Sequence, residues 1–312
     1  PQGYSSAASD VYKRQINTQG AGGTIAKYAN IASMKSSGIE LTISSKNMRT
    51  KDFSWNTDFI FSKTKNEITD LKSHANVLSL ISGNGFGREG YPVRGLFSIP
   101  FAGLTEDGLP TFINQDGQKT ISSFNFQEYE KLDFLKYEGP TDPTITGSFG
   151  NILTYKNLKL NVFVTYSFGN VIRLDPVFSN AYSDLDAMPK EFKNRWMKAG
   201  DENVTNIPTI VSTRMNQQYA YLNMAYNAYN YSDVRIADGG FIRLKEISLS
   251  YDLPAKVINF FRLNKLQLKL QATNLCLLYA DSKLNGQDPE FFRSGGVSTP
   301  VPKQFTFTVR LG

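Results

Sequence analysis

Apolar and polar residues alternate with a period of two along seven segments of the chain. In residues 265–274, Leu266 and every second residue up to Ala272 are apolar, and the residues that follow each of them are Gln, Lys, Gln and Thr. The other six segments lie near residues 39–44, 53–62, 145–155, 158–168, 246–251 and 305–311. Successive side chains of a strand point to opposite faces. The pattern therefore predicts seven strands, each with one apolar face and one polar face.

The connections between these segments are alternately short and long. The short ones cover residues 47–52, 156–157 and 253–264, and the last should carry one helical turn that begins at Pro254. The long ones cover residues 63–144, 169–239 and 277–302. Short periplasmic turns and long extracellular loops are typical of outer-membrane barrels, whereas compact soluble domains seldom contain several structureless connections of this size. We therefore predict an all-β fold: the C-terminal part, about seven antiparallel strands, of a large transmembrane β-barrel.

Composition agrees with this fold class and excludes others. No run approaches the ~20 apolar residues of a membrane-spanning helix, whereas a barrel strand needs only ~10 alternating residues. The formal net charge of +6 is spread along the chain, so no nucleic-acid partner is expected. The 22 Phe and 16 Tyr residues suit a barrel as well as a soluble β protein.

The opening of the chain differs in style from the rest. Residues 1–15, PQGYSSAASDVYKRQ, contain no secretory signal and are expected to be extraneous or disordered. Residues 16–35 are predicted as a loop that leads into the barrel, and residues 36–312 as the barrel segment. Bacterial single-chain barrels have an even number of strands, and unpaired strand edges in lipid cost several kcal/mol per backbone group. We therefore expect further strands upstream and a fragment that does not fold alone.

Several segments, in order, resemble one family. They are SSGIELTISSKNMRTKDFSWNTDFIFSKTKNEITDL, YPVRGLFSIPFAGLTEDGLPTF, YKNLKLNVFVTYSFGN, DGGFIRLKEISLSYDLP, LKLQATNL, GQDPE and PKQFTFTVRLG. Together they resemble SusC/RagA-like TonB-dependent outer-membrane transporters from about Ser36 to Gly312. The family's N-terminal carboxypeptidase-like domain, plug and TonB box have no counterpart here. Its last strand usually ends with an aromatic residue, whereas this sequence stops at Gly312, so we expect a truncation of one or a few residues. The resemblance implies import of oligosaccharides or peptides across the outer membrane of a Bacteroidetes-like bacterium, powered by the TonB complex and with a SusD-like surface lipoprotein as partner.

Catalytic chemistry is not indicated. His74 is the one histidine and lies in a polar, loop-like stretch, so no Ser-His-Asp triad is expected. Cys276 is the one cysteine, so no internal disulfide can form. Glu106, Asp107 and Asp116 could suggest a calcium loop, but the spacing of a calcium-binding loop is absent. Asp107-Gly108 and Asp116-Gly117 read better as the turns of a hairpin. We expect no enzyme activity, no cofactor and no metal.

Two groups of residues are candidates for contact with solute. The first is a set of aromatic residues in the second long connection: Trp196, Tyr219, Tyr221, Tyr226, Tyr229 and Tyr231. Such side chains could stack on sugars or face a partner protein, and the alternative is that they only pack the loop. The second is a set of charges on the polar strand faces: Glu40, Asp58, Lys159, Glu246, Lys269 and Arg310. These are expected to line the lumen or contact the plug, because a charge in mid-bilayer lipid costs ~2–4 kcal/mol.

Two alternative functions remain open. A soluble extracellular carbohydrate-binding β-sandwich would show the same alternation, but with short connections at both ends. A TonB-dependent receptor for siderophores or a vitamin would share the barrel without the SusC-like segments.

Overall fold

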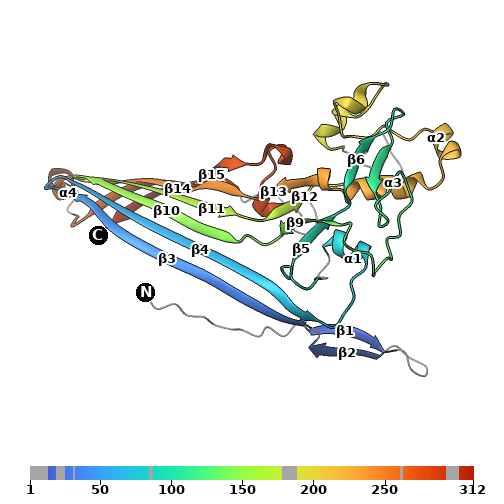
Figure 1. The fold of residues 1–312 in the computed structure, drawn as a ribbon. Coiled ribbons are helices and arrows are strands. Elements are labelled where there is room, and N and C mark those ends of the chain that lie inside the picture. Colours follow the sequence, from blue (N-terminus) through green and yellow to red (C-terminus); the bar gives the residue numbers. More distant parts are fainter. Residues whose placement is uncertain are drawn as a thin grey trace.

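The computed structural model describes residues 13–18, 25–30, 32–83, 87–177, 188–260, 263–292 and 302–312. Its long body is one seven-stranded antiparallel sheet, in the order β16-β15-β14-β11-β10-β4-β3 (Figure 1). The strands are β3 (Ala32–Arg49), β4 (Phe53–Leu71), β10 (Ile145–Tyr155), β11 (Leu158–Phe168), β14 (Phe241–Asp252), β15 (Leu266–Ala280) and β16 (Gln304–Leu311). Each strand pairs with its neighbours along the chain, which confirms the seven predicted strands. β3 and β4, with 18 and 19 residues, are longer than the alternation indicated.

The strand register extends the two faces across the whole sheet. Leu270 lies opposite Leu249 on one side and Phe307 on the other. Lys269, one residue earlier, lies opposite Ser250 and Thr308 on the other face of the same strands. The sheet therefore has one continuous apolar face and one continuous polar face.

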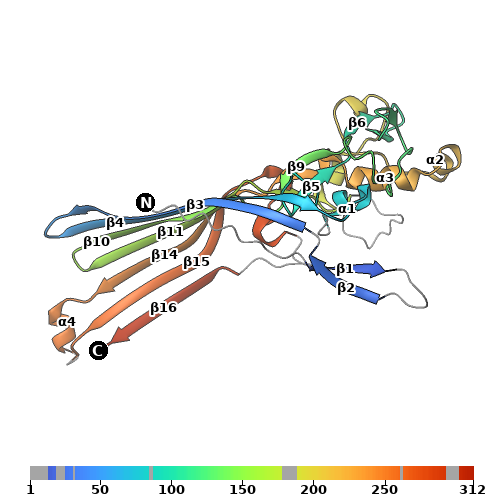
Figure 2. The same cartoon turned by 60° about the horizontal axis from the view of Figure 1, so that its bottom comes forward.

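Within the described residues, nothing covers the apolar face. Leu270 is 57% exposed, Phe307 61% and Ile39 68%. Figure 2 shows the strands fanning out in a single layer, with β3 and β16 as the two edge strands. A soluble monomer rarely exposes an apolar patch of more than a few hundred Å², so this face requires an apolar environment.

A close approach fixes β10 against β4 and β11. Tyr166 on β11 lies over Gly147 on β10, and its hydroxyl donates to the Ile60 carbonyl oxygen at 3.0 Å. A Cβ atom at Gly147 would come within 2.2 Å of that oxygen and 2.4 Å of the hydroxyl. Position 147 therefore tolerates only glycine.

The connections at the two ends of the sheet differ. At one end, the turns β3–β4 and β10–β11 are short, and α4 (Ala255–Phe260) follows Pro254 in the third turn, as predicted. At the other end, the first two long connections fold into a separate body, here called the distal domain, which comprises the described parts of residues 72–144 and 169–240 (Figure 1). These two long connections are therefore folded and not structureless.

The distal domain contains short strands and helices. The first connection contributes α1 (Val77–Ser82), β5 (Gly95–Ser98), β6 (Phe101–Leu104), β7 (Pro110–Ile113), β8 (Lys119–Thr120) and β9 (Lys136–Pro140). The second contributes β12 (Val171–Arg173), η1 (Lys190–Asn194), η2 (Asp201–Asn203), α2 (Thr213–Gln218), α3 (Leu222–Asn230), η3 (Asp233–Arg235) and β13 (Ile236–Asp238). The third connection carries only η4 (Ser282–Leu284) and η5 (Pro289–Phe291) among its described residues.

A hydrophobic core joins the first two connections. Leu80, Ile81 and Ile99 are fully buried, as is Phe112. Tyr229 from α3 is 1% exposed and meets the Phe101 ring edge-on, with 5.9 Å between centroids. Because both connections supply this core, neither can form it alone.

The start of the described chain also departs from expectation. Residues 16–35 were predicted as a loop, but β1 (Lys13–Thr18) and β2 (Ile25–Asn30) form an antiparallel hairpin and β3 begins at Ala32. The loop prediction is wrong over these strands. The division at residue 36 stays a prediction.

No helix in the part of the chain that the structure describes combines the length and hydropathy needed to cross a membrane.

Candidate functional site

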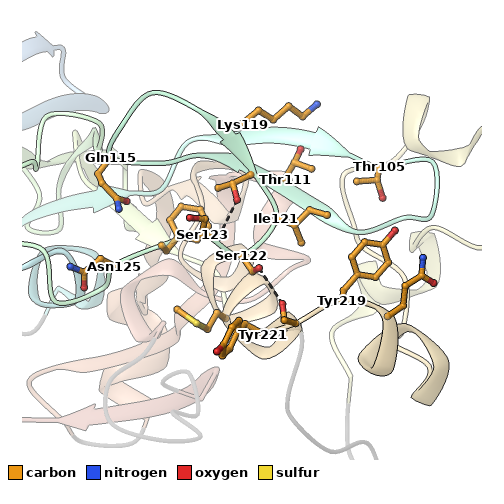
Figure 3. A pocket seen from close by; sticks show the side chains of 15 residues that line it. Thr105, Thr111, Gln115, Lys119, Ile121, Ser122, Ser123, Asn125, Tyr219 and Tyr221 are labelled. Atoms are coloured by element: carbon orange, nitrogen blue, oxygen red, sulfur yellow. Dashed lines mark hydrogen bonds between the residues drawn. The ribbon is translucent and has the colours of Figure 1, made fainter.

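The distal domain contains a cavity of about 970 Å³ between the β6–β7–β8 sheet and the segment that joins α2 to α3 (Figure 3). Its lining is mainly neutral and polar, with Lys119 as the one charged member. Labelled residues in Figure 3 include Thr105, Thr111, Gln115, Ser122, Ser123, Asn125, Tyr219 and Tyr221. Hydroxyl and amide groups of this kind suit hydrogen bonding to a neutral polar solute.

Turn chemistry builds the walls of this cavity. Asn114 Oδ1 accepts from the backbone N–H groups of Asp116 at 3.1 Å and Gln118 at 2.9 Å, and Gly117 has φ +74°. Gly108 has φ +76° in the turn before β7. These two turns have the geometry that Asp-Gly pairs favour, so the hairpin reading holds at both. No group of three or more His, Cys, Asp or Glu residues that could hold a metal occurs in the described ranges.

Two of the predicted tyrosines reach the cavity. The Tyr219 hydroxyl donates to Asp107 Oδ2 at 3.1 Å. This hydrogen bond to the carboxylate raises the pKa of Tyr219 above its usual value, and burial adds to the rise. Tyr221 is 70% exposed and adopts φ +62°, the left-handed region. A contact with solute stays a prediction for both residues.

The other three tyrosines lie in or against the hydrophobic core of the distal domain. Tyr226 is 7% exposed, and its hydroxyl donates to the Thr209 carbonyl oxygen at 2.7 Å. Burial raises the pKa of Tyr229 to about 12. Tyr231 is half-buried beneath the Arg173 guanidinium, 5.5 Å from its ring centroid. For Tyr226 and Tyr229, burial leaves no face on which a sugar could stack, so the packing alternative describes them.

Trp196 anchors a turn. A Cβ atom at Gly108 would lie 2.4 Å from the indole ring, which shows how closely Trp196 covers this glycine. The indole N–H donates to Glu202 Oε2 at 3.0 Å. Trp196 is not among the residues that line the cavity.

The structure brings together only some of the predicted polar-face charges. Lys159, Lys269 and Arg310 line one cavity of about 250 Å³. Glu246 Oε1 lies 4.0 Å from the Lys269 ammonium and accepts from the Asn161 amide at 3.1 Å.

The remaining two predicted charges lie on β3 and β4, at the other edge of the sheet. Asp58 accepts from the Ser44 hydroxyl at 2.7 Å. Glu40 is exposed and lies opposite Ser62. They belong to the polar face but not to the cavity.

Sequence reasoning missed three buried arginines that organise the distal end. Arg173 donates to the Phe97 carbonyl oxygen at 2.6 Å, and Arg235 pairs with Glu191 at 2.7 Å. Arg243 donates to both carboxylate oxygens of Asp288, at 2.6 and 2.7 Å. The sequence does show arginines beside the long connections, which could have marked these residues as candidates. Their partners lie more than 40 residues away, so the sequence could not show which groups they bind.

Comparison with known proteins agrees with this architecture. The chain is 25% identical over 291 residues to the TonB-dependent receptor P3 of Formosa agariphila, covering 86% of this chain and 26% of that protein. It is 24% identical over 314 residues to the TonB-dependent receptor P39 of the same organism, covering 87% of this chain and 29% of that protein. The chain thus spans about a quarter of the length of these relatives. No family model matches.

Solved structures give the same fold. A structure of the RagAB peptide transporter superposes with a TM-score of 0.68 at 23% identity, covering 92% of this chain and 30% of that one. The RagAB peptide importer in its open-open state superposes with a TM-score of 0.69 at 21% identity, covering 95% of this chain and 31% of that one. At this identity the likeness establishes the fold.

The sheet and its two unlike ends define the class of fold: a mostly β chain built on a seven-stranded antiparallel sheet, similar to a segment of the RagAB transporter. Within that class, the resemblance to SusC/RagA-like TonB-dependent transporters is confirmed over most of the chain.

Proposed function

We propose that the chain is part of the wall of a TonB-dependent outer-membrane importer. The continuous apolar face carries this proposal, because it runs across all seven strands and nothing described covers it. Lipid is the environment that matches such a face, and water in the lumen matches the polar face. The long connections would then lie outside the cell, and the short turns in the periplasm.

In this proposal the distal domain meets the solute first. Its cavity of about 970 Å³ is lined mainly by residues with hydroxyl and amide groups, among them Tyr219 and Tyr221. Oligosaccharides and peptides both present the hydroxyl, amide and carbonyl groups that such a lining can bind. A SusD-like surface lipoprotein is proposed as partner at this end, and the TonB complex as the source of energy. The location is the outer membrane of a Bacteroidetes-like bacterium.

The proposal is tested by asking which face of β16 meets lipid. In the complete transporter, with Cys276 replaced by Ser, single spin labels are placed at Phe307 and at Thr308, which point to opposite faces. The label at position 307 should be accessible to molecular oxygen in the bilayer, and the label at 308 to a water-soluble nickel chelate. Equal access of the nickel chelate to both positions would refute the membrane wall.

A carbohydrate-binding β-sandwich is the second candidate from the sequence. It needs a second sheet packed on the apolar face, and the described residues form no such layer there. A receptor for siderophores or a vitamin would share the barrel. A gene for a SusD-like lipoprotein beside this one would favour the SusC-like importer over that receptor.

A further inference from the structure

Three cations from three strands converge on the polar face of the sheet. Lys159 on β11, Lys269 on β15 and Arg310 on β16 line the cavity of about 250 Å³. Lys159 and Lys269 both lie opposite Ser250 on the intervening strand β14. Arg310 lies opposite Gln267, two residues from Lys269. Neighbouring strands lie ~5 Å apart, so Lys159 and Lys269 are about 10 Å apart across Ser250, and Arg310 lies one strand further. Only their length lets the three side chains line one cavity.

The cavity holds no carboxylate to balance these charges. Its other lining residues are Ile152, Asn161, Ser248, Ser250 and Gln267.

Two acidic residues flank the cavity, and both already accept hydrogen bonds. Glu246, 4.0 Å from the Lys269 ammonium, accepts from Asn161 and from Ser248 at 3.1 Å each. Asp252 accepts from the Gln267 amide at 3.0 Å. An anion inside the cavity would therefore meet three cations and the Ser250 hydroxyl, and it would share Lys269 with Glu246.

We propose that this cavity binds an anionic group, a carboxylate or a sulfate, of the solute that passes along the polar face. The proposal rests on the proposed function, which places this face on the water-filled side of the barrel. Arg310 supplies the planar fork of donors that matches carboxylate and sulfate oxygens, and the two lysines supply mobile point charges. An importer with this wall would favour oligomers that carry acidic groups.

The first experiment measures anion binding directly, without transport. In the complete transporter in detergent, lysine amines are reductively ¹³C-dimethylated, which preserves their charge, and their NMR signals are followed. Sodium sulfate is compared with sodium chloride at equal ionic strength. The Lys159 and Lys269 signals should shift saturably with sulfate. Lys46 is the control: it lies on β3, on the polar face of the same sheet but outside the cavity, and its signal should not shift with sulfate.

Substitution of the guanidinium sharpens the test. Arg310→Gln removes a charge-assisted donor and should weaken sulfate binding at Lys159 and Lys269 by at least about tenfold. Lys46→Gln should leave that binding unchanged. Equal, unsaturable shifts at all three lysines, or an Arg310→Gln variant that binds sulfate as the parent does, would overturn the proposal.

Two further probes distinguish the source of the anion. A triglutamate peptide and an oligogalacturonate are titrated in the same way, and the one that binds more tightly than sulfate identifies an acidic peptide or an acidic glycan. If neither binds more tightly than sulfate, the assignment to an acidic solute fails. If the spin labels on β16 show lipid access at position 307 and water access at position 308 while no anion shifts the lysine signals, only this inference fails. If both labels report water, the proposed function fails even when the lysines bind sulfate.

Discussion

Loss of the Asp288 charge should release the last long connection from the sheet. Arg243 on β14 and Asp288 before η5 have side chains only 5% and 8% exposed, with donor–acceptor distances of 2.6 and 2.7 Å. Removing one partner of a buried ion pair costs about 3–5 kcal/mol. Glu290, at 3.0 Å from the same guanidinium and 45% exposed, still pairs with Arg243. We therefore expect Asp288→Asn to cost about 3 kcal/mol, the lower end of that range.

Amide hydrogen exchange measures this loss locally. Two backbone N–H groups serve as reporters. The Gln287 N–H donates to the Leu284 carbonyl oxygen, and the Phe291 N–H donates to the Asp288 carbonyl oxygen. At about 1.4 kcal/mol per tenfold, Asp288→Asn should speed their exchange about 100-fold in the native protein. Paired replacement by Arg243→Met and Asp288→Leu should restore most of the protection, because no buried charge is then left unpaired.

An exposed ion pair provides the matched control. Lys65 and Glu67 lie 3.2 Å apart, and their side chains are 73% and 42% exposed. Pairs of this kind contribute about 0–1 kcal/mol, so Glu67→Gln should change exchange near it by no more than about fivefold. If exchange over residues 281–292 rises no more in Asp288→Asn than in Glu67→Gln, the buried pair does not hold this connection.

Three further predictions concern the sheet, the distal core and pH. Gly147→Ala places a Cβ atom 2.2 Å from a backbone oxygen. It should lower the urea midpoint by an amount equivalent to about 1–3 kcal/mol or more. Gly150→Ala is the control: its Cβ atom would have its nearest contact at 3.3 Å, so it should lower the midpoint by less. Tyr229→Ala should destabilise the distal domain by about 3–5 kcal/mol and Tyr221→Ala by less than about 0.5 kcal/mol, as near-UV circular dichroism during heating will show. Backbone N–H groups donate to the Glu128 carboxylate, that of residue 130 foremost, and hold the pKa of Glu128 below its usual value. The ionised Glu128 therefore stabilises the folded state fully above the pKa of the unfolded state. This stabilisation is lost as the pH falls through the pKa of the folded state. The Tm of the parent protein should accordingly fall more steeply than that of Glu128→Gln between about pH 5 and about pH 3, and parallel curves would contradict this.

Local pattern was sufficient to find the seven strands of the sheet, but not their full length. Alternation at residues 265–274 and 305–311 identified β15 and β16, and their register then placed Leu268 opposite Val309 as the apolar pattern requires. The pattern failed to find the outer halves of β3 and β4, where polar residues such as those at 64–67 occupy both faces. It also failed within the distal domain, because strands of two to five residues are too short to show a period.

The candidate site was predictable only in part. The tyrosines of the second long connection were found from their density in sequence, yet density does not distinguish Tyr221, which is 70% exposed, from Tyr229, which is 1% exposed. The helical turns of α3 decide that difference, since they point Tyr226 and Tyr229 toward a core whose other half comes from residues 75–135.

By itself, the sequence determined the strands, their two faces and the short turns, because the period of two and the turn residues act between close neighbours. Tertiary structure alone decided which distant residues meet. Arg243 pairs with Asp288 across 45 residues. Lys159, Lys269 and Arg310 line one cavity only because of the register of four strands, β11, β14, β15 and β16. Register and burial depend on the simultaneous packing of many segments, and no single stretch of the chain contains that information.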